Sequence, residues 1–382
     1  MSTPSSVCGV TRFPAPTRSH GRRRGRRLPS EVGKPSGLAF HWRSIDPGRC
    51  RVARPATQAG RGWRKRSQRS VQRERAKDPG LGVRGLHAQG LTGSGVAVAI
   101  IDGKVRRDRV EYADRLRHYE ELDDFSGLPF EMHGPAMASL LVGRSVGVAP
   151  GAELHYFAVD FARLTPERLA MAIDHVVDRN RTLPHDERVR LLSASTGYRD
   201  EERTVVDAAI RRAIDSDVFV LLSVYPLAFL DPPLAIRGLG CSPWRDCRLP
   251  EAFTFSPGEA AFWRAKDESV ADVLARRAAS DAELGYVTVY APAHHRTVAG
   301  HHHARHYRYD VEGGDSQWAP YLVGVLALAL QVAPELHASD LAALLAAGAE
   351  HGDGLIVPAR MIELARAQGA AGASSVFAGG TD

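Results

Sequence analysis

Apolar runs alternate with amphipathic helical patterns after residue 80. Residues 96–101 read VAVAII, a β-branched apolar run typical of a strand buried on both faces. Further strand patterns lie at 153–159, 190–195, 218–224 and 286–290. Helical patterns lie between them at 133–142, 165–179 and 201–215. In the second of these helices, Thr165 is the expected N-cap and a proline occupies the first turn. The alternation predicts an α/β protein with a mostly parallel central sheet.

Three parts of the chain differ in composition and in hydrophobic pattern. Residues 1–80 are rich in Arg, Ser, Pro and Gly without apolar periodicity, so we expect a disordered basic tail or sequence upstream of the true start. Residues 81–368 are the expected folded domain. Its stretch at about 226–285 is expected to be an irregular insertion with one helix at 267–282. The later helices are expected at 316–332, 338–347 and 358–367, followed by a flexible tail at 369–382.

Charge is divided unevenly between these parts. Residues 1–80 carry 20 Lys and Arg against 4 Asp and Glu, whereas the other 302 residues carry 30 and 40. The net charge of +6 therefore comes from the tail, and the folded part is acidic. An acidic domain argues against a nucleic-acid-binding globule, although the tail could bind anionic partners such as nucleic acid.

Targeting and membrane signals are weak. The first 30 residues contain GRRRGRR instead of an apolar signal-peptide core, which favours a cytoplasmic protein and leaves secretion by another route open. The longest charge-free stretch, 316–334, contains Gln317 and Gln331, so it predicts a buried helix and no membrane span. The sequence carries no signal for an oligomeric state.

Cysteine and histidine suggest neither a disulfide scaffold nor a metal site. Cys241 and Cys247 are two of only four cysteines, and they could bridge a short loop or stay as free thiols. The chain also has a histidine-rich stretch, but it lacks acidic or cysteine residues at the spacing of metal ligands. A solvated loop is therefore favoured over a metal centre, and no cofactor is expected. The histidines of this stretch are His294, His295, His301, His302, His303 and His306.

Three segments hold residues of catalytic type. Asp102 ends the strand at 96–101, where open parallel sheets place functional groups. His133 begins one apolar helix. Ser316 opens another, where backbone N–H groups and the helix dipole favour a developing oxyanion. Each signal is weak alone, but the order Asp, His, Ser with separations of 31 and 183 residues matches the order of the subtilisin triad.

The flanking residues resemble the subtilisin-like serine peptidases over about residues 85–350. Six blocks are similar to the family's motifs and follow in the same order: LTGSGVAVAIIDG at 91–103, HGPAMAS at 133–139, GVAPGAEL at 147–154, SASTG at 193–197, YAPA at 290–293 and GDSQWAPYLVG at 314–324. The resemblance implies a subtilisin-like, three-layer, doubly wound fold. It also implies a serine endopeptidase that hydrolyses peptide bonds through an acyl-enzyme intermediate.

The resemblance assigns roles to individual residues. Ser316 would be the nucleophile, His133 its general base, and Asp102 the group that orients the imidazole. Ser195, Thr196 and Gly197 would pair with the backbone of a peptide or protein substrate.

The sequence departs from the family at the oxyanion hole. The family has an asparagine after a strand like 218–224, but the one asparagine of this chain, Asn180, lies in another segment. Ser223 or Tyr225 could supply a hydroxyl donor instead. Asp315 replaces the usual threonine and puts a carboxylate beside the nucleophile. The alternative function is therefore a catalytically weak or inactive peptide- or protein-binding module with the same fold.

Overall fold

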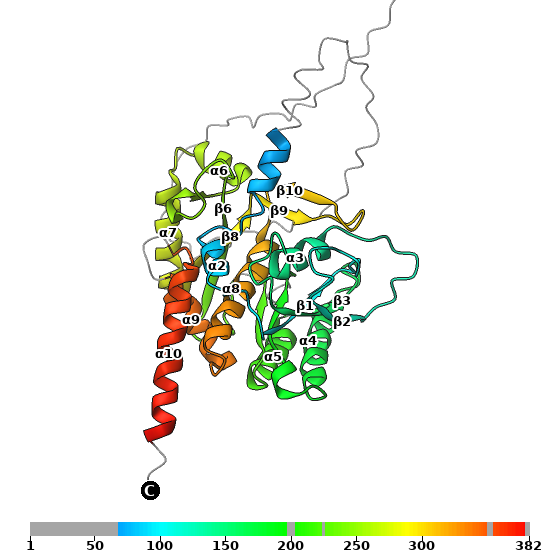
Figure 1. Cartoon of the computed structure of the whole chain (residues 1–382). Coiled ribbons are helices and arrows are strands. Elements are labelled where there is room, and N and C mark those ends of the chain that lie inside the picture. Colours follow the sequence, from blue (N-terminus) through cyan, green and yellow to red (C-terminus); the bar gives the residue numbers. More distant parts are fainter. Residues whose placement is uncertain (1–67, 197–202, 224–225, 350–353, 379–382) are drawn as a thin grey trace, which may run out of the picture. The chain divides into compact units, whose positions relative to one another are not determined.

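A five-stranded parallel sheet lies at the centre of the structure, a computed structural model that describes residues 68–196, 203–223, 226–349 and 354–378, with side chains to residue 371 (Figure 1). The strand order is β2-β3-β1-β4-β5, so β1 is the central strand. The strands are β1 (Ala97–Asp102), β2 (Leu116–Glu121), β3 (Glu153–Ala158), β4 (Val189–Ala194) and β5 (Phe219–Leu222).

Five further strands form two smaller sheets. In the three-stranded sheet β7-β6-β8, β6 and β8 are parallel and β7 is antiparallel to β6. An antiparallel hairpin, β9–β10, follows β8. The bounds are β6 (Leu234–Cys241), β7 (Phe253–Thr254), β8 (Val287–His294), β9 (Arg296–Ala299) and β10 (Tyr307–Asp310).

Helices cover both faces of the central sheet. The helices α3 and α8 lie on one face, and α4 and α5 lie on the other. The labelled helices of the structure are α2 (Val83–Ala88), α3 (His133–Val142), α4 (Pro166–Asn180), α5 (Arg203–Asp215), α6 (Pro257–Arg264), α7 (Val270–Glu283), α8 (Trp318–Val332), α9 (Leu341–Ala349) and α10 (Pro358–Ala378). Short 3₁₀ turns are η2 (His185–Glu187), η4 (Pro250–Ala252), η5 (Asp315–Gln317) and η6 (Ala338–Asp340). None of the helices in the described ranges combines the length and the apolar character needed to cross a membrane.

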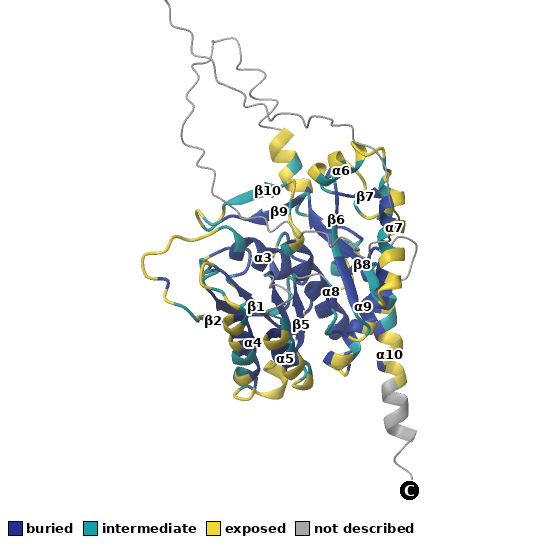
Figure 2. Cartoon of the chain, turned by 180° about the vertical axis from the view of Figure 1, so that it is seen from behind, coloured by how far each residue is buried: buried dark blue, intermediate teal, exposed yellow. Residues whose placement is uncertain are grey.

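Successive residues of β1 show how the layers are arranged. Val98 and Ile100 pack into one core with α3, α8 and α9, whereas Ala99 and Ile101 pack into a second core with α4 and α5. The strands β1, β3, β4 and β5 and the helix α8 are buried, the edge strand β2 is only partly buried, and α4 and α5 expose their outer faces (Figure 2). The predicted α/β fold with flanking helices and a mostly parallel sheet is confirmed.

Several elements extend beyond the sequence prediction. The stretch 226–285 contains the buried strand β6 and the helix α6 in addition to α7, whose predicted range was 267–282. The last helix, α10, continues to Ala378, past the predicted end at 367. The loop expected around the histidines contains the β9–β10 hairpin.

The segment 68–80 is ordered, which corrects the predicted tail boundary at residue 80. It forms a helix at 68–75 and then runs beside β9. Thr297 of β9 donates its backbone N–H to Ala76 O at 2.9 Å and its hydroxyl to Arg73 O at 2.6 Å. These contacts attach the segment to the domain. The rest of the predicted tail, residues 1–67, lies outside the described residues.

A disulfide closes the loop that follows β6. Cys241 and Cys247 are bonded, with their Cα atoms 5.6 Å apart. Of the two cysteine states that the sequence leaves open, the structure therefore has the bridged one. The loop also contacts the N-terminal segment, because the backbone N–H of Leu81 donates to Cys247 O at 2.6 Å.

Candidate active site

Asp102 and His133 meet at the carboxyl end of the central sheet. Asp102 is the last residue of β1 and is completely buried. His133 is the first residue of α3, and its Nδ1 lies 2.9 Å from both carboxylate oxygens of Asp102. The backbone N–H of Gly103 donates to Asp102 Oδ1 at 2.7 Å, which fixes the orientation of the carboxylate.

Glycine at position 134 allows this approach of helix to strand. A Cβ there would lie 2.3 Å from Gly103 O and 2.4 Å from the hydroxyl of Tyr156. No side chain fits at those distances, so the sequence His-Gly at the start of α3 is what lets His133 reach Asp102. The hydroxyl of Tyr156 in turn donates to Gly103 O at 2.5 Å and holds the turn after β1.

The surroundings of His133 favour its charged form. Burial lowers the pKa of His133, but the charge of Asp102 and its hydrogen bond outweigh burial, with smaller contributions from Glu131 and Asp310. The pKa is therefore raised above its usual value of 6.5. Phe161 packs edge-on against the ring, with centroids 5.4 Å apart, while a quarter of the His133 side chain stays exposed.

Ser316 lies in η5, the short turn that leads into α8. Gly313 makes the turn possible, because its φ is +60° and a Cβ there would lie 1.9 Å from Ala293 O. Ser316 Oγ donates to Ser195 O at 3.5 Å, and Ser195 Oγ donates to Ser316 O at 2.8 Å. These contacts place Ser316 beside the end of β4.

The nucleophile candidate does not bond to the imidazole in this conformation. Within the described ranges, no hydrogen bond joins Ser316 to His133, although η5 packs against α3. A second contact holds the turn in place, since Gln317 Nε2 donates to Asp310 Oδ2 at 2.9 Å. The structure thus brings the three residues to the same region and pairs only the Asp102 and His133 side chains.

Ser223 lies beside the turn that carries Ser316. Its hydroxyl donates to Asp315 O at 3.3 Å, a long hydrogen bond, so this donor is near Ser316 but engaged with the backbone. Thr196 follows the end of β4, whereas Tyr225 and Gly197 lie outside the described residues. Asn180 is structural, because its side chain accepts from Val189 N and donates to Val189 O, both at 2.8 Å.

Asp315 brings a negative charge next to Ser316. Burial raises the pKa of Asp315, Glu259 adds to the increase, and Arg237 and Arg277 oppose it. Both arginines are engaged elsewhere: Arg277 pairs with Glu259 at 2.7 Å, and Arg237 pairs with the buried carboxylate of Asp281. In the described part of the chain, the Asp315 carboxylate therefore has no ion-pair partner of its own, and its Oδ1 lies beside Gly238 of β6, 3.6 Å from where a Cβ would stand.

The histidine-rich stretch serves the fold through its backbone. The buried guanidinium of Arg109 donates to the carbonyl oxygens of His303 and His306. His294 is buried in β8, and burial lowers its pKa to about 3. Among the described residues, no group of three or more His, Cys, Asp or Glu side chains is arranged to hold a metal ion.

Sequence reasoning missed three contributors to the site: Phe161, Glu131 and Asp310. Phe161 contacts the His133 ring, and the two carboxylates raise its pKa. Each comes from a different loop or strand end, and none belongs to a motif block. Only the three-dimensional arrangement connects them to the imidazole.

Comparison with known proteins places the chain near the subtilisin-like proteases. No protein-family model matches the chain. Over 304 residues, 70% of this chain, it is 24% identical to the subtilisin-like protease PopC of Myxococcus xanthus (strain DK1622). The match covers 58% of PopC, so the chain spans little more than half the length of this curated relative.

Two solved structures align with the chain, and the first of them shows the same fold. The prenylagaramide maturation protease PagA aligns with a TM-score of 0.50 and 17% identity over 74% of this chain and 98% of PagA. A cold-adapted subtilisin-like serine proteinase aligns with a TM-score of 0.46 and 18% identity over 69% and 85% of the two chains. The PagA alignment shows that the chain shares this fold, and the PopC match makes its sequence similar to that of a subtilisin-like protease.

Proposed function

We propose that this protein is a serine endopeptidase that uses Asp102, His133 and Ser316. The observation that carries the proposal is the pairing of His133 Nδ1 with both oxygens of the buried Asp102 at 2.9 Å. This pairing leaves Nε2 as the free nitrogen of the ring, the one that a neighbouring hydroxyl can use as a base. A buried carboxylate at the end of a central strand also stabilises the imidazolium that forms when His133 accepts a proton.

The reaction would begin with a rotation of the Ser316 side chain. Its 3.5 Å hydrogen bond to Ser195 O is long and weak, so breaking it costs little free energy. Ser316 Oγ then gives its proton to His133 Nε2 and forms a bond to the scissile carbonyl carbon. His133 returns the proton to the leaving amine, which departs as the C–N bond breaks and leaves an acyl-enzyme. A water molecule, deprotonated by His133, attacks the acyl carbon and restores the Ser316 hydroxyl.

A peptide or protein substrate would bind beside β4. Ser195 and Thr196 follow the last hydrogen-bonded residues of β4, where an extended peptide can add its own backbone, and Gly197 would continue the pairing. The substrate would compete with Ser316 for Ser195 O, so binding itself would favour release of the serine side chain.

A peptide-binding module with little turnover is the second candidate. Three observations favour it: the Ser316 hydroxyl is turned toward Ser195, Ser223 is bonded to Asp315 O, and residue 315, directly before Ser316, is an acid. Loss of one side-chain oxyanion donor costs roughly 100- to 1000-fold in turnover. The two candidates therefore share a binding site and differ in the reactivity of Ser316.

A fluorophosphonate probe distinguishes the two candidates. It reacts with a serine only when a base activates the hydroxyl. Labelling of the wild-type protein that disappears in Ser316→Ala and persists in the exposed-loop control Ser126→Ala supports the peptidase. A folded wild-type protein that resists the probe and cleaves no peptide while still binding one supports the module.

A further inference from the structure

A basic cavity of about 700 Å³ lies away from the candidate active site. Three segments line it: residues 74–84, the turn after α3, and the disulfide loop 243–248. Its cationic lining residues are Arg75, Lys77, Arg84, Arg144, Arg245 and Arg248. Since His133 begins α3 and Arg144 follows its end, the 10-residue helix separates the two sites by about 15 Å.

The acidic residues of the cavity are already engaged. Glu74 pairs with Lys77 Nζ at 2.8 Å, and Asp246 pairs with Arg248 at 2.7 Å. Asp78 Oδ1 accepts the backbone N–H of Gly80 at 2.9 Å. Two of the six cations are therefore paired with carboxylates, and Asp78 keeps its negative charge. Four arginines form no ion pair, and six cations against three carboxylates give the lining a net charge of +3.

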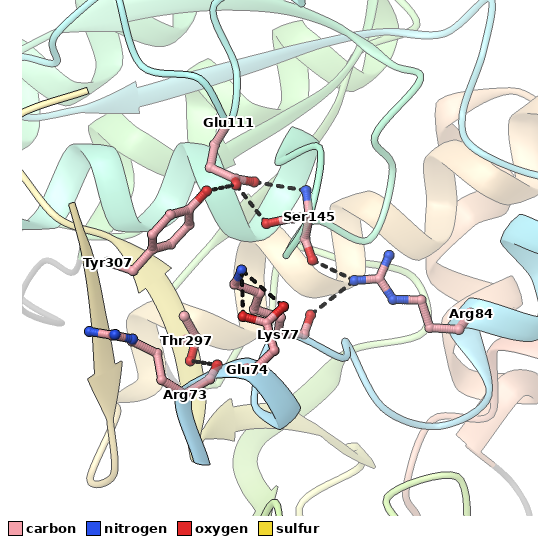
Figure 3. A network of polar contacts seen from close by, with 8 residues as sticks. All are labelled: Arg73, Glu74, Lys77, Arg84, Glu111, Ser145, Thr297 and Tyr307. Carbon is pink, nitrogen blue, oxygen red and sulfur yellow. Dashed lines mark hydrogen bonds and ion pairs between the residues drawn. The ribbon is translucent and has the colours of Figure 1, made fainter. Parts of the chain in front are cut away.

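These four arginines have no carboxylate partner in the described ranges. Arg84 Nη2 donates to the backbone oxygens of Lys77 at 3.1 Å and Ser145 at 2.5 Å (Figure 3). Arg75 lies over the Trp244 ring, 5.1 Å from its centroid. Arg144 and Arg245 make no side-chain hydrogen bond within the described part of the chain. Arg84 is thus held in place by neutral carbonyls, with its charge uncompensated.

A buried arginine behind the cavity adds to this positive charge. Arg296 is 4% exposed and lines a second cavity of about 20 Å³, which shares Arg75 and Asp78 with the first. Its Nη2 donates to Val146 O at 3.0 Å, while Nε and Nη1 have no partner among the described residues. Burial lowers the pKa of Arg296 to about 10, so the guanidinium is charged at neutral pH. Arg296 forms no ion pair among the described residues, and only the charge of Asp78 and the nearby Tyr321 ring offset the cost of its burial, so a bound anion nearby would stabilise it further.

We propose that the basic cavity binds a small polyanion with at least two phosphate groups, such as pyrophosphate or a nucleoside diphosphate. The planar fork of a guanidinium matches two phosphate oxygens, and several unpaired arginines suit neighbouring phosphates. The volume lies in the range of small-molecule sites. Because the cations come from three separate segments, such a ligand would tie the N-terminal segment to the turn after α3 and to the disulfide loop.

Calorimetric titration of the full chain with pyrophosphate at constant ionic strength tests this site. We expect saturable binding, weakened at least roughly tenfold by Arg144→Gln and by Arg245→Gln. Both side chains are exposed and carry no structural contact, so these variants should keep the fold. Arg212→Gln, which removes one exposed arginine from α5, is the matched control and should leave the affinity unchanged.

The outcomes separate this site from the other cations of the chain. Binding that persists undiminished in both cavity variants would come from elsewhere, and it would overturn the proposal, as would the absence of binding at millimolar pyrophosphate. A parallel titration with ADP distinguishes the sources of phosphate: equal affinity identifies the phosphates as the recognised group, and tighter binding identifies a nucleotide. As a second readout, pyrophosphate should raise the Tm of the wild type and of Arg212→Gln more than that of Arg144→Gln.

Discussion

The Asp102–His133 pair and the turn that carries Ser316 differ in how firmly the fold fixes them. Asp102 and His133 begin or end regular elements, meet at 2.9 Å, and are held by Gly103 and a glycine at the start of α3. Ser316 lies in a short 3₁₀ turn, faces Ser195 at 3.5 Å, and has a carboxylate next to it. The acid–base half of the site is complete, whereas the nucleophile and oxyanion half is weakly arranged.

This contrast predicts opposite responses to mutation. Changes to the Asp102–His133 pair should only reduce activity, because the geometry of that pair is already favourable. Changes around Ser316 should be able to increase activity, because an amide donor for the oxyanion can be added and the negative charge of Asp315 can be removed. Four measurements follow from this difference, in order of decreasing effect.

Replacement of Asp102 by asparagine should have the largest effect. Asp102→Asn keeps the shape but favours the wrong imidazole tautomer, and kcat for peptide or ester hydrolysis should fall about 10⁴-fold. Asp174→Asn, an exposed carboxylate paired with Arg212, is the control and should be neutral. A decrease of less than tenfold for Asp102→Asn would show that the pair does not drive the reaction.

Addition of an amide donor should raise turnover. Val224→Asn, Tyr225→Asn or Pro226→Asn introduces an asparagine within three residues of Ser223, whose hydroxyl bonds to Asp315 O, and one of them should raise kcat by roughly tenfold or more. Steady-state kinetics of all three variants check this expectation. If the wild type is already fast and every variant is slower, another group fills the oxyanion hole.

Removal of the charge at Asp315 should give a smaller gain. Asp315→Asn takes away a negative charge beside the developing oxyanion, and kcat should rise by roughly fivefold at pH 8. Because the pKa of Asp315 is raised, the wild-type carboxyl is protonated more readily on acidification, and the advantage of the variant should shrink as pH falls. Glu312→Gln, an exposed carboxylate on the same loop, should show no such gain.

The pH profile should show the smallest effect. His133 acts as a base only when neutral, so kcat/KM should increase with pH through the pKa of His133, with a midpoint above 6.5. Glu131→Gln removes one of the carboxylates that raise this pKa, so the midpoint should move to lower pH. A midpoint below 6.5 in the wild type would contradict the electrostatic description of the site.

Local patterns account for what the sequence predicts well. β1, α3 and α4 come from an apolar run, an apolar helix start and the Thr165 cap, whose hydroxyl accepts from Arg168 N in the structure. These signals depend on neighbours in the chain. The pairing of Asp102 with His133 could be expected from a different signal, the order of the motifs. A strand end and the start of the following helix meet at one edge of a parallel sheet.

The missed elements are held by distant contacts. β6 reads LAIRGLGC, where glycines and an arginine interrupt the apolar pattern, and its position is determined by parallel pairing with β8 some fifty residues later. The segment 68–80 is polar and is attached through backbone bonds to Thr297. The weak contact of Ser316 with Ser195 likewise joins residues 121 positions apart, beyond the reach of any motif.

The burial of α8 has a consequence for how the protein loses activity. All residues from Trp318 to Leu330 are buried, and Ser316 lies two residues before this helix. Amide hydrogens of such a helix exchange with solvent only when the whole domain opens, so the protection of α8 should report the global free energy of unfolding. Ser316 is thereby anchored to the part of the molecule that opens last. Heat inactivation and cooperative melting should coincide, because unfolding of α8 displaces the backbone that leads to Ser316.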